Sequence, residues 1–198
     1  MFITQMREKY LSFFDFLLYW IKARSKYDIH SPFVYKIYSQ VLKDRTRYPA
    51  YQELKKKYPK IRNGRYYRLL YRLSKYFNPG TIYFVGNENG AEGNYLNGAG
   101  DPKKNQKDLL KLSGTIELGF IDLEAIEVRE SGYFSRLLQH TANDSVLIIW
   151  NLRRSKNCYN IWKEIIQSGK VTVTIDIFQL GLIFFREELS KEDFILNF

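Results

Sequence analysis

A short apolar run leads directly into a glycine-rich turn in the segment Thr81-Ile82-Tyr83-Phe84-Val85-Gly86-Asn87-Glu88-Asn89-Gly90-Ala91-Glu92-Gly93. The β-branched and aromatic residues from 81 to 85 are typical of a short buried strand. The glycines that follow have the spacing GxxxGxxG, and glycine lets a backbone approach a neighbour or a ligand closely. Ligands of open α/β sheets bind beyond the carboxyl ends of the strands. The segment therefore indicates either a structural turn or a ligand-binding loop at the edge of a sheet.

Beyond this turn, strand-like and helix-like segments alternate. Helical patterns surround Tyr133 to Leu138 and Tyr159 to Ile166, and a polar connector spans Asn97 to Asp108. Strand, helix, strand alternation predicts parallel pairing in an α/β layered sheet, and the last three strands are too closely spaced for helical crossovers, which predicts an antiparallel edge. The strands after the first are expected at Thr115–Ile121, Ser145–Trp150, Val171–Ile177, Leu182–Arg186 and Phe194–Phe198.

Before the turn, the hydrophobic period is that of helices. Apolar residues recur at helical spacing from Tyr10 to Ile21, which predicts a helix over about residues 5–24. Ser31 and Pro32 are typical of a helix start, and further helices are expected at Tyr51–Tyr58 and Arg65–Phe77. We therefore expect a helical extension over residues 1–80 and a Rossmann-like domain over residues 81–198, together forming one compact unit.

Composition excludes several classes of protein. The chain has 198 residues, 45% of them hydrophobic and 26% charged, which is typical of a globular protein. Cys158 is the single cysteine and there are two histidines, so neither an internal disulfide nor a Cys- and His-based metal site is expected. The apolar run from Tyr10 to Ile21 falls short of the ~20 residues that a membrane span needs. We expect a cytoplasmic protein with no transmembrane segment and no metal.

Positive charge is concentrated in the helical part. Residues 1–80 hold 18 lysines and arginines against 5 aspartates and glutamates, whereas the remaining residues hold 13 against 16. This distribution is typical of a solvated basic surface, and it also leaves open a nonspecific contact with nucleic acid or another anionic surface. The aromatic N-terminal helix is expected to pack on the sheet or on a second copy of the chain. The basic residues of the candidate surface are Arg65, Arg68, Arg72 and Lys75, with Lys55, Lys56, Lys57, Lys60 and Arg62.

The sequence resembles the class I S-adenosylmethionine-dependent methyltransferases, and more closely a family of small bacterial methyltransferase-like proteins. The matching segments are His30-Ser31-Pro32-Phe33-Val34, Arg68 to Leu73, the glycine turn, Phe120-Ile121-Asp122, Ser145 to Ile149, and Val171 to Arg186. The resemblance implies a Rossmann-like methyltransferase sheet with S-adenosylmethionine as its cofactor. It implies that the cofactor contacts Gly86, Asn87, Glu88, Gly90, Gly93 and Asp122.

The chain departs from the family pattern at the chemistry. Phe84 stands where relatives carry the acidic residue that serves the methionine amino group, and Trp150-Asn151 stands where they carry Asp-Asp. Only 29 positions separate Gly86 from Thr115, whereas two strands, two helices and their turns need roughly 45 or more. We therefore expect the sheet to be truncated on the cofactor side. Phe84 or the connector over residues 97–108 is expected to crowd the cleft.

Three functions remain open from the sequence. The favoured one is a degenerate methyltransferase-like protein, weakly active or inactive, that acts as a binding or regulatory module. Loss of two cofactor carboxylates costs on the order of 3 to 6 kcal/mol, which weakens a micromolar site to about millimolar. The second is an active small-molecule methyltransferase in which Glu88 and Asp122 take over the cofactor contacts. The third is a nucleic-acid or anionic-surface binder acting through residues 1–80.

Overall fold

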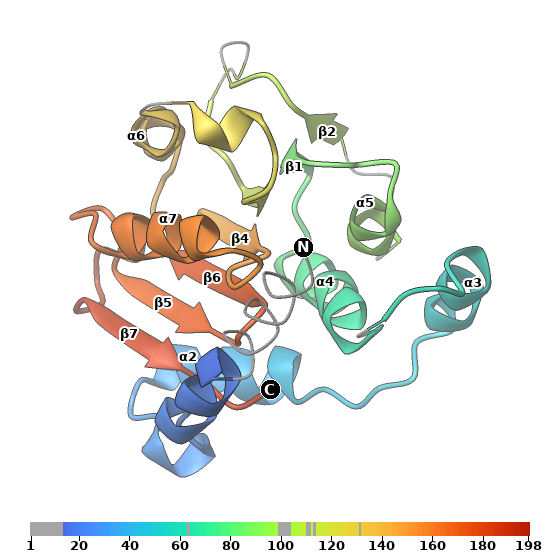
Figure 1. Ribbon diagram of the computed structural model, residues 1–198, viewed down its shortest axis with the longest axis horizontal. Coiled ribbons are helices and arrows are strands. Elements are labelled where there is room, and N and C mark those ends of the chain that lie inside the picture. Colours follow the sequence, from blue (N-terminus) through green and yellow to red (C-terminus); the bar gives the residue numbers. More distant parts are fainter. Residues whose placement is uncertain (1–13, 63, 99–103, 110–111, 113, 131) are drawn as a thin grey trace, which may run out of the picture.

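Seven strands form one sheet in the order β2-β1-β3-β4-β6-β5-β7 (Figure 1). The computed structural model describes residues 14–62, 64–98, 104–109, 112, 114–130 and 132–198. β2, β1, β3 and β4 are parallel, whereas β6 is antiparallel to both of its neighbours, β4 and β5. The expected α/β sheet, mostly parallel with an antiparallel edge, is confirmed. The strands span Thr81–Val85 (β1), Lys104–Gln106 (β2), Leu118–Asp122 (β3), Val146–Trp150 (β4), Val173–Asp176 (β5), Leu180–Phe184 (β6) and Glu192–Ile195 (β7).

The last strand pairs differently from a simple antiparallel meander. β5 and β6 form the expected antiparallel hairpin, but β7 lies on the far side of β5 and runs parallel to it. The connection from β6 to β7 passes the start of β5, where the amide of Thr172 donates to the carbonyl of Phe184 and its own carbonyl accepts from the amide of Glu192. The expectation that all three final strands pair antiparallel is therefore wrong for β7. The chain passes the start of β5 to its far side, so β7 runs parallel to β5.

On one side of β1 the sheet continues by only one short strand, β2. A seven-residue helix, α5 (Ala91–Asn97), leads from the glycine turn to the three-residue strand β2. Within the described residues β2 is the outermost strand of this edge. Both elements fall in or beside the segment expected to be a polar connector. Lys104-Asn105-Gln106 carries no apolar signal, and backbone pairing with β1 alone makes it a strand.

Helices cover both faces of the sheet, and each central strand alternates its side chains between them. On β1, Ile82 and Phe84 face α4, whereas Tyr83 and Val85 face α6 and α7. The basic extension is therefore not separate from the sheet, because α4 supplies buried leucines to one of the two cores. The helices are η1 (Lys26–Asp28), α2 (Pro32–Ile37), η2 (Tyr38–Leu42), α3 (Ala50–Lys57), α4 (Gly64–Phe77), η4 (Glu127–Arg129), α6 (Tyr133–Gln139) and α7 (Lys156–Ile166).

The helix boundaries in the extension follow the local sequence. Ser31 caps α2 by accepting a hydrogen bond from the amide of Val34 at 3.4 Å, and Pro32 occupies the first helical position, as expected. The helix continues as the π-helical turn η2. α4 ends before Asn78, whose φ of 44° is a left-handed conformation that stops a helix. The stop predicted at Asn78-Pro79-Gly80 is confirmed.

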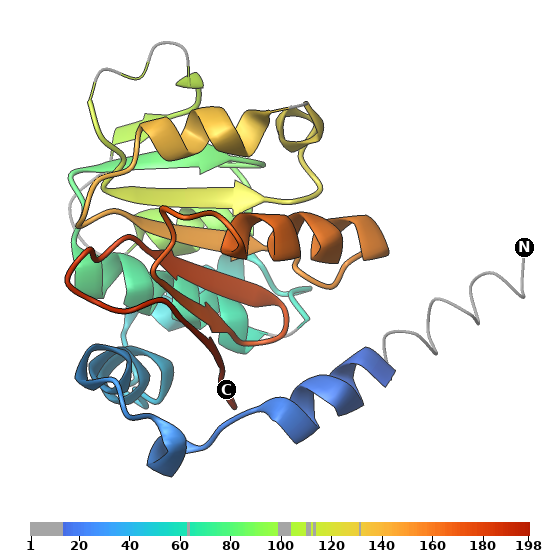
Figure 2. The same ribbon diagram turned by 90° about the vertical axis from the view of Figure 1, so that its left-hand side faces the viewer.

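The N-terminal helix is described from residue 14 to residue 22 and extends away from the sheet (Figure 2). The part of the expected helix before residue 14 lies outside the described residues. Tyr19 is buried, and its hydroxyl donates to the carbonyl of Leu196. Residue 24 forms a parallel bridge with Leu196, so the helix is attached to the chain just after β7. Leu18, Trp20 and Ile21 are exposed. None of the helices in the described residues is both long and apolar enough to cross a bilayer.

Candidate functional site

The carboxyl ends of four strands meet at one edge of the sheet. β1, β3 and β4 are parallel, and β5 has the same direction because it and β4 are both antiparallel to β6. The strands end at Val85, Asp122, Trp150 and Asp176. Since ligands of open α/β sheets bind at this edge, it is the first place to look for a functional site.

The glycine turn folds tightly onto the start of α5. Gly86 has a φ of 133°, and a Cβ on it would lie 3.1 Å from the Cβ of Asp122. A Cβ on Gly93 would lie 1.8 Å from the carbonyl oxygen of Glu88, so only glycine fits there. The amide of Gly90 donates to the carbonyl of Asn87 at 3.0 Å. Gly90 and Gly93 therefore allow close contacts within the backbone of the turn, whereas Gly86 allows the close approach of the Asp122 side chain.

The acidic side chains of the turn already have partners. Glu88 forms an ion pair with Lys107, with 3.0 Å between Oε2 and Nζ. Glu92 accepts a hydrogen bond of 2.9 Å from the hydroxyl of Tyr67, which comes from α4. Burial, together with the charge of Glu92, raises the pKa of Tyr67. Asn87 is exposed. Glu88, which was expected to contact a cofactor, and Glu92 of the same turn are thus both engaged in bonds within the protein.

Asp122, at the end of β3, is held by its neighbours. Its Oδ1 accepts from Nδ2 of Asn151 at 2.8 Å and from the amide of Glu124 at 3.0 Å. Asn151 has a φ of 65°, a left-handed conformation that asparagine tolerates better than most residues. The side chain of Asn151 therefore donates a hydrogen bond to Asp122, which an ionised carboxylate at this position could not do. In the described parts of the chain, no group of three or more His, Cys, Asp or Glu side chains is placed to hold a metal ion.

An aromatic cluster fills the same edge on the α4 side of the sheet. The rings of Phe84 and Phe120 are stacked with their centroids 4.6 Å apart, and those of Phe120 and Trp150 are 6.1 Å apart. Tyr67 closes the cluster edge-on against Trp150 at 5.4 Å. Phe84 and Phe120 are each 1% exposed, and Trp150 is 2% exposed. We call Tyr67, Phe84, Phe120 and Trp150 the edge cluster.

The sequence singled out Phe84 and Trp150 as departures but did not place Phe120 and Tyr67 beside them. Phe84 and Phe120 occupy paired positions in the register of β1 and β3. The signal that could have joined them is the alternation of faces, because residues paired across neighbouring strands point to the same face of the sheet. Tyr67 comes from a helix, and no local pattern places it. The expectation that Phe84 or the connector over residues 97–108 crowds the cleft stays a prediction.

A second group lies at the end of β5. Arg153 donates to both carboxylate oxygens of Asp176, at 2.8 Å and 2.6 Å, and to the carbonyl of Phe178 at 2.7 Å. The ring of Phe178 also packs against Phe16 and Tyr19 of the N-terminal helix. This buried ion pair was not predicted from the sequence. It anchors the N-terminal helix beside the carboxyl edge.

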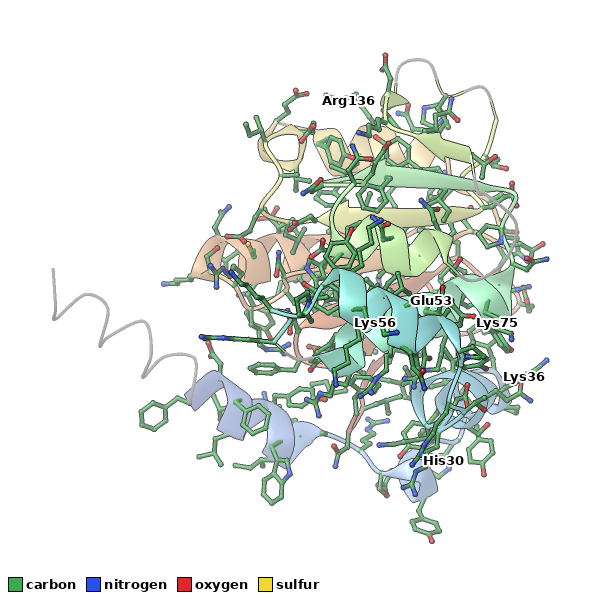
Figure 3. The ribbon with its side chains drawn as sticks, turned by 90° about the vertical axis from the view of Figure 1, so that its right-hand side faces the viewer. His30, Lys36, Glu53, Lys56, Lys75 and Arg136 are labelled. Carbon is green, nitrogen blue, oxygen red and sulfur yellow. The ribbon has the colours of Figure 1, made fainter. Side chains whose placement is uncertain are left out.

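The histidine of the His-Ser-Pro-Phe-Val segment lies elsewhere. Figure 3 shows His30 on the surface between η1 and α2, and its side chain is exposed. Ser31 and Pro32 of the same segment serve the start of α2, and Val34 is fully buried. The segment therefore has a structural role at the base of the helical layer.

Comparison with solved structures finds the same fold. No protein-family model matches the chain, and no curated protein matches it either. Cofactor-bound Rv0187 from MTB shares 13% identity with a TM-score of 0.52, covering 70% of this chain and 89% of its own. The Podospora anserina methyltransferase PaMTH1, bound to SAH, shares 11% identity with a TM-score of 0.51, covering 81% and 98%. The O-methyltransferase from Bacillus cereus in complex with SAH shares 11% with a TM-score of 0.50, covering 77% and 97%.

These similarities rest on identities of 11–13%. At identities this low they concern the arrangement of the backbone. The chain has the α/β fold of the class I S-adenosylmethionine-dependent methyltransferases.

Proposed function

We propose that this chain is a methyltransferase-fold protein that does not transfer methyl groups and acts as a binding module. The observation that supports this proposal is the edge cluster. Three buried rings fill this side of the sheet, where an enzyme of this fold needs a polar cleft: Phe84 next to the end of β1, Phe120 in the middle of β3 and Trp150 at the end of β4.

The residues at this edge do not fit S-adenosylmethionine, the cofactor that the fold implies. Its amino group and its ribose hydroxyls are polar, and burying them without partners costs free energy. Phe84 offers only a stacked ring, and the nearest carboxylates of the turn are bonded to Lys107 and Tyr67. A cofactor would have to break these bonds, which adds to the binding free energy already lost with the missing acidic residue. We therefore expect affinity of about millimolar or weaker, on the scale of 1.4 kcal/mol per tenfold.

A calorimetric titration of the intact chain with S-adenosylmethionine and with S-adenosylhomocysteine tests the proposal. We expect no saturation below ~100 micromolar. The O-methyltransferase from Bacillus cereus, whose solved structure holds SAH, provides the positive control under the same conditions. Saturation of this chain below that concentration would reject the proposal. It would favour an active small-molecule methyltransferase in which Glu88 and Asp122 contact the cofactor.

If binding is seen, two variants locate it. Asp122→Asn keeps the shape of the side chain and removes its charge, so it should weaken the binding of a cofactor that Asp122 contacts. Glu124→Gln removes a carboxylate from the adjacent loop that pairs with Arg154 at 3.4 Å. Equal effects of the two changes would indicate general electrostatics instead of a cofactor site.

A further inference from the structure

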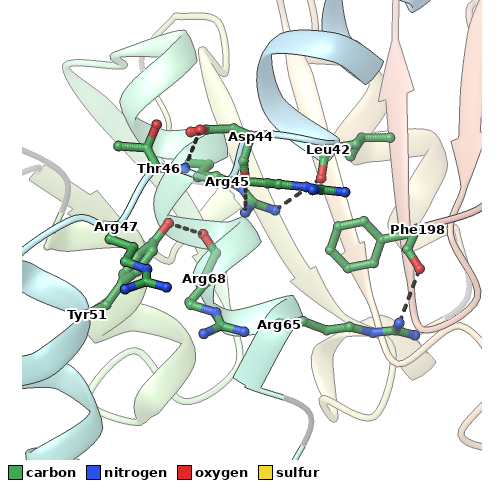
Figure 4. A pocket seen from close by; sticks show the side chains of 10 residues that line it. Leu42, Asp44, Arg45, Thr46, Arg47, Tyr51, Arg65, Arg68 and Phe198 are labelled. Atoms are coloured by element: carbon green, nitrogen blue, oxygen red, sulfur yellow. Dashed lines mark hydrogen bonds between the residues drawn. The ribbon is translucent and has the colours of Figure 1, made fainter.

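A strongly basic groove lies between α4 and the segment that follows η2 (Figure 4). Its volume is about 360 Å³, within the range of small-molecule sites. It is separate from the edge cluster, since the two share no residue. Its walls consist of Leu42, Asp44, Arg45, Thr46, Arg47, Tyr51, Arg65, Arg68, Arg72 and Phe198, which we call the arginine groove.

Acidic side chains balance only part of the positive charge of the arginine groove. Asp44 is the one acidic side chain among the residues of its walls, and its carboxylate accepts hydrogen bonds from neighbouring residues. It accepts from the amide of Thr46 at 2.8 Å and from the hydroxyl of Tyr48 at 2.9 Å. Among the described residues, no carboxylate forms an ion pair with Arg45 or Arg68. These exposed guanidiniums lie close to other like charges, so an anion between them would lower the free energy of the folded state.

Internal hydrogen bonds hold the walls of the groove in place. Nη1 of Arg72 donates to the carbonyl of Asp44 at 2.8 Å, and Nη2 lies 3.4 Å from the carbonyl of Leu42. Nε of Arg72 is buried and has no hydrogen-bond partner. Burial lowers the pKa of Arg72, which reflects the cost of desolvating its charge. The hydroxyl of Tyr51 donates to the carbonyl of Arg68 at 3.3 Å. The arginines thus project from a backbone that is already fixed.

The groove also has an apolar side. Nη1 of Arg65 donates to the carbonyl of Phe198 at 3.1 Å, and its guanidinium lies 5.3 Å from the centre of that ring. The rings of Phe198 and Tyr51 are partly exposed. A guanidinium is a planar fork that matches the oxygens of phosphate, and several forks in one concavity favour a ligand with more than one negative charge.

The geometry points to the arginine groove as a binding site for the phosphate groups of a small phosphorylated molecule. Arg45 and Arg68 supply the free guanidiniums from opposite walls, and Arg47 and Arg65 flank them. The rings of Tyr51 and Phe198 face the organic part of the ligand. A compact ligand suits this groove better than a nucleic-acid strand, because the charge is gathered in one concavity of small-molecule size.

Calorimetric titration with inorganic pyrophosphate tests the site directly on the intact chain. We expect saturable binding that weakens at least about tenfold in the double variant Arg45→Gln/Arg68→Gln, since charge-assisted hydrogen bonds to both walls are removed. Both side chains are exposed, so the variant is expected to fold, and a thermal melt without ligand checks this. Pyrophosphate should also raise the melting temperature of the unmodified chain but not that of the variant.

The matched control is Lys36→Gln/Lys56→Gln, which removes the same charge from exposed positions on α2 and α3 (Figure 3). Its affinity should stay within about twofold of the unmodified chain. Equal weakening in both double variants, or no saturation up to ~1 mM, would overturn the inference. A single-stranded oligonucleotide that binds and is not displaced by pyrophosphate would also overturn it, in favour of a nucleic-acid surface. These outcomes are independent of whether S-adenosylmethionine binds.

Discussion

Arg153 and Asp176 form a two-pronged ion pair in which Nη2 lies 2.6 Å from Oδ2 and Nη1 lies 2.8 Å from Oδ1. Their side chains are 8% and 6% exposed. The pair joins the turn after β4 to the end of β5, and the ring of Tyr19 lies 5.4 Å from the guanidinium. A buried pair of this kind is sensitive to the loss of one partner, because the remaining charge stays desolvated.

Replacement of Arg153 by methionine should therefore destabilise the protein. We expect a loss of about 3–5 kcal/mol in the free energy of unfolding, measured by urea denaturation. Arg154→Met is the matched control, since Arg154 pairs with Glu124 on the surface, where the side chains are 68% and 46% exposed. That change should cost ~0–1 kcal/mol. Similar losses in the two variants would show that the buried pair contributes no more to stability than the surface pair does.

The edge cluster makes a second prediction about stability. Phe84→Ala removes a ring that is 1% exposed and stacked on Phe120, so it should cost about 3–5 kcal/mol. Tyr35→Ala, at a side chain that is 47% exposed, should change the free energy of unfolding by less than about 1 kcal/mol. Urea denaturation measures both. A small effect at Phe84 would mean that the space at this edge can collapse or take up water, and the cleft would then be less filled than the structure indicates.

The glycine turn can be tested with one methyl group. Gly93→Ala places a Cβ against the carbonyl of Glu88, a backbone atom that cannot move without opening the turn. We expect a loss of about 1–3 kcal/mol or more in the free energy of unfolding. Gly169→Ala has open space around the new Cβ and should stay within about 0.5 kcal/mol. If both changes are tolerated alike, the turn is looser than its contacts imply.

The sequence predicted the fold where the signal was local. Runs of buried residues marked β1, β3 and β4, and Ser31 with Pro32 marked the start of α2. It missed β2, because a three-residue polar strand at an edge is held by backbone pairing alone. The pairing of β7 was also predicted wrongly. Its neighbour depends on the path of the chain after β6, which passes the start of β5 and places β7 on the far side of that strand.

The candidate site was predicted only in part, for the same physical reason. The sequence named Phe84 as the replacement for an acid and Gly86 as the turn, and both lie at the carboxyl edge. It could not pair Glu92 with Tyr67 or Asp122 with Asn151, because each bond joins residues at least 25 positions apart. The basic residues of α4 were visible as a stripe, but Arg45 was not joined to them. The groove exists only because a loop 20 residues earlier folds back beside Arg65.

Buried tyrosines predict how stability changes with pH. Burial is the first cause that raises the pKa of Tyr133, followed by its hydrogen bond with Tyr83, and the pKa values of Tyr19 and Tyr66 are raised in the same direction. Above the ordinary tyrosine pKa of about 10, the unfolded chain loses protons that the folded chain retains. The stability that these groups contribute is therefore complete below about pH 10 and is lost as the pH rises further.

Urea denaturation at a series of pH values from about 8 to 11 measures this loss, together with the ultraviolet absorbance of tyrosinate. Tyr133→Phe should reduce the slope of stability against pH by up to about 1.4 kcal/mol per unit, the value for one proton. Tyr35→Phe removes a hydroxyl from an exposed ring and should leave the slope unchanged. Stability that stays constant through this range would contradict the prediction, because it would mean that the buried hydroxyls ionise as readily in the folded chain as in the unfolded one.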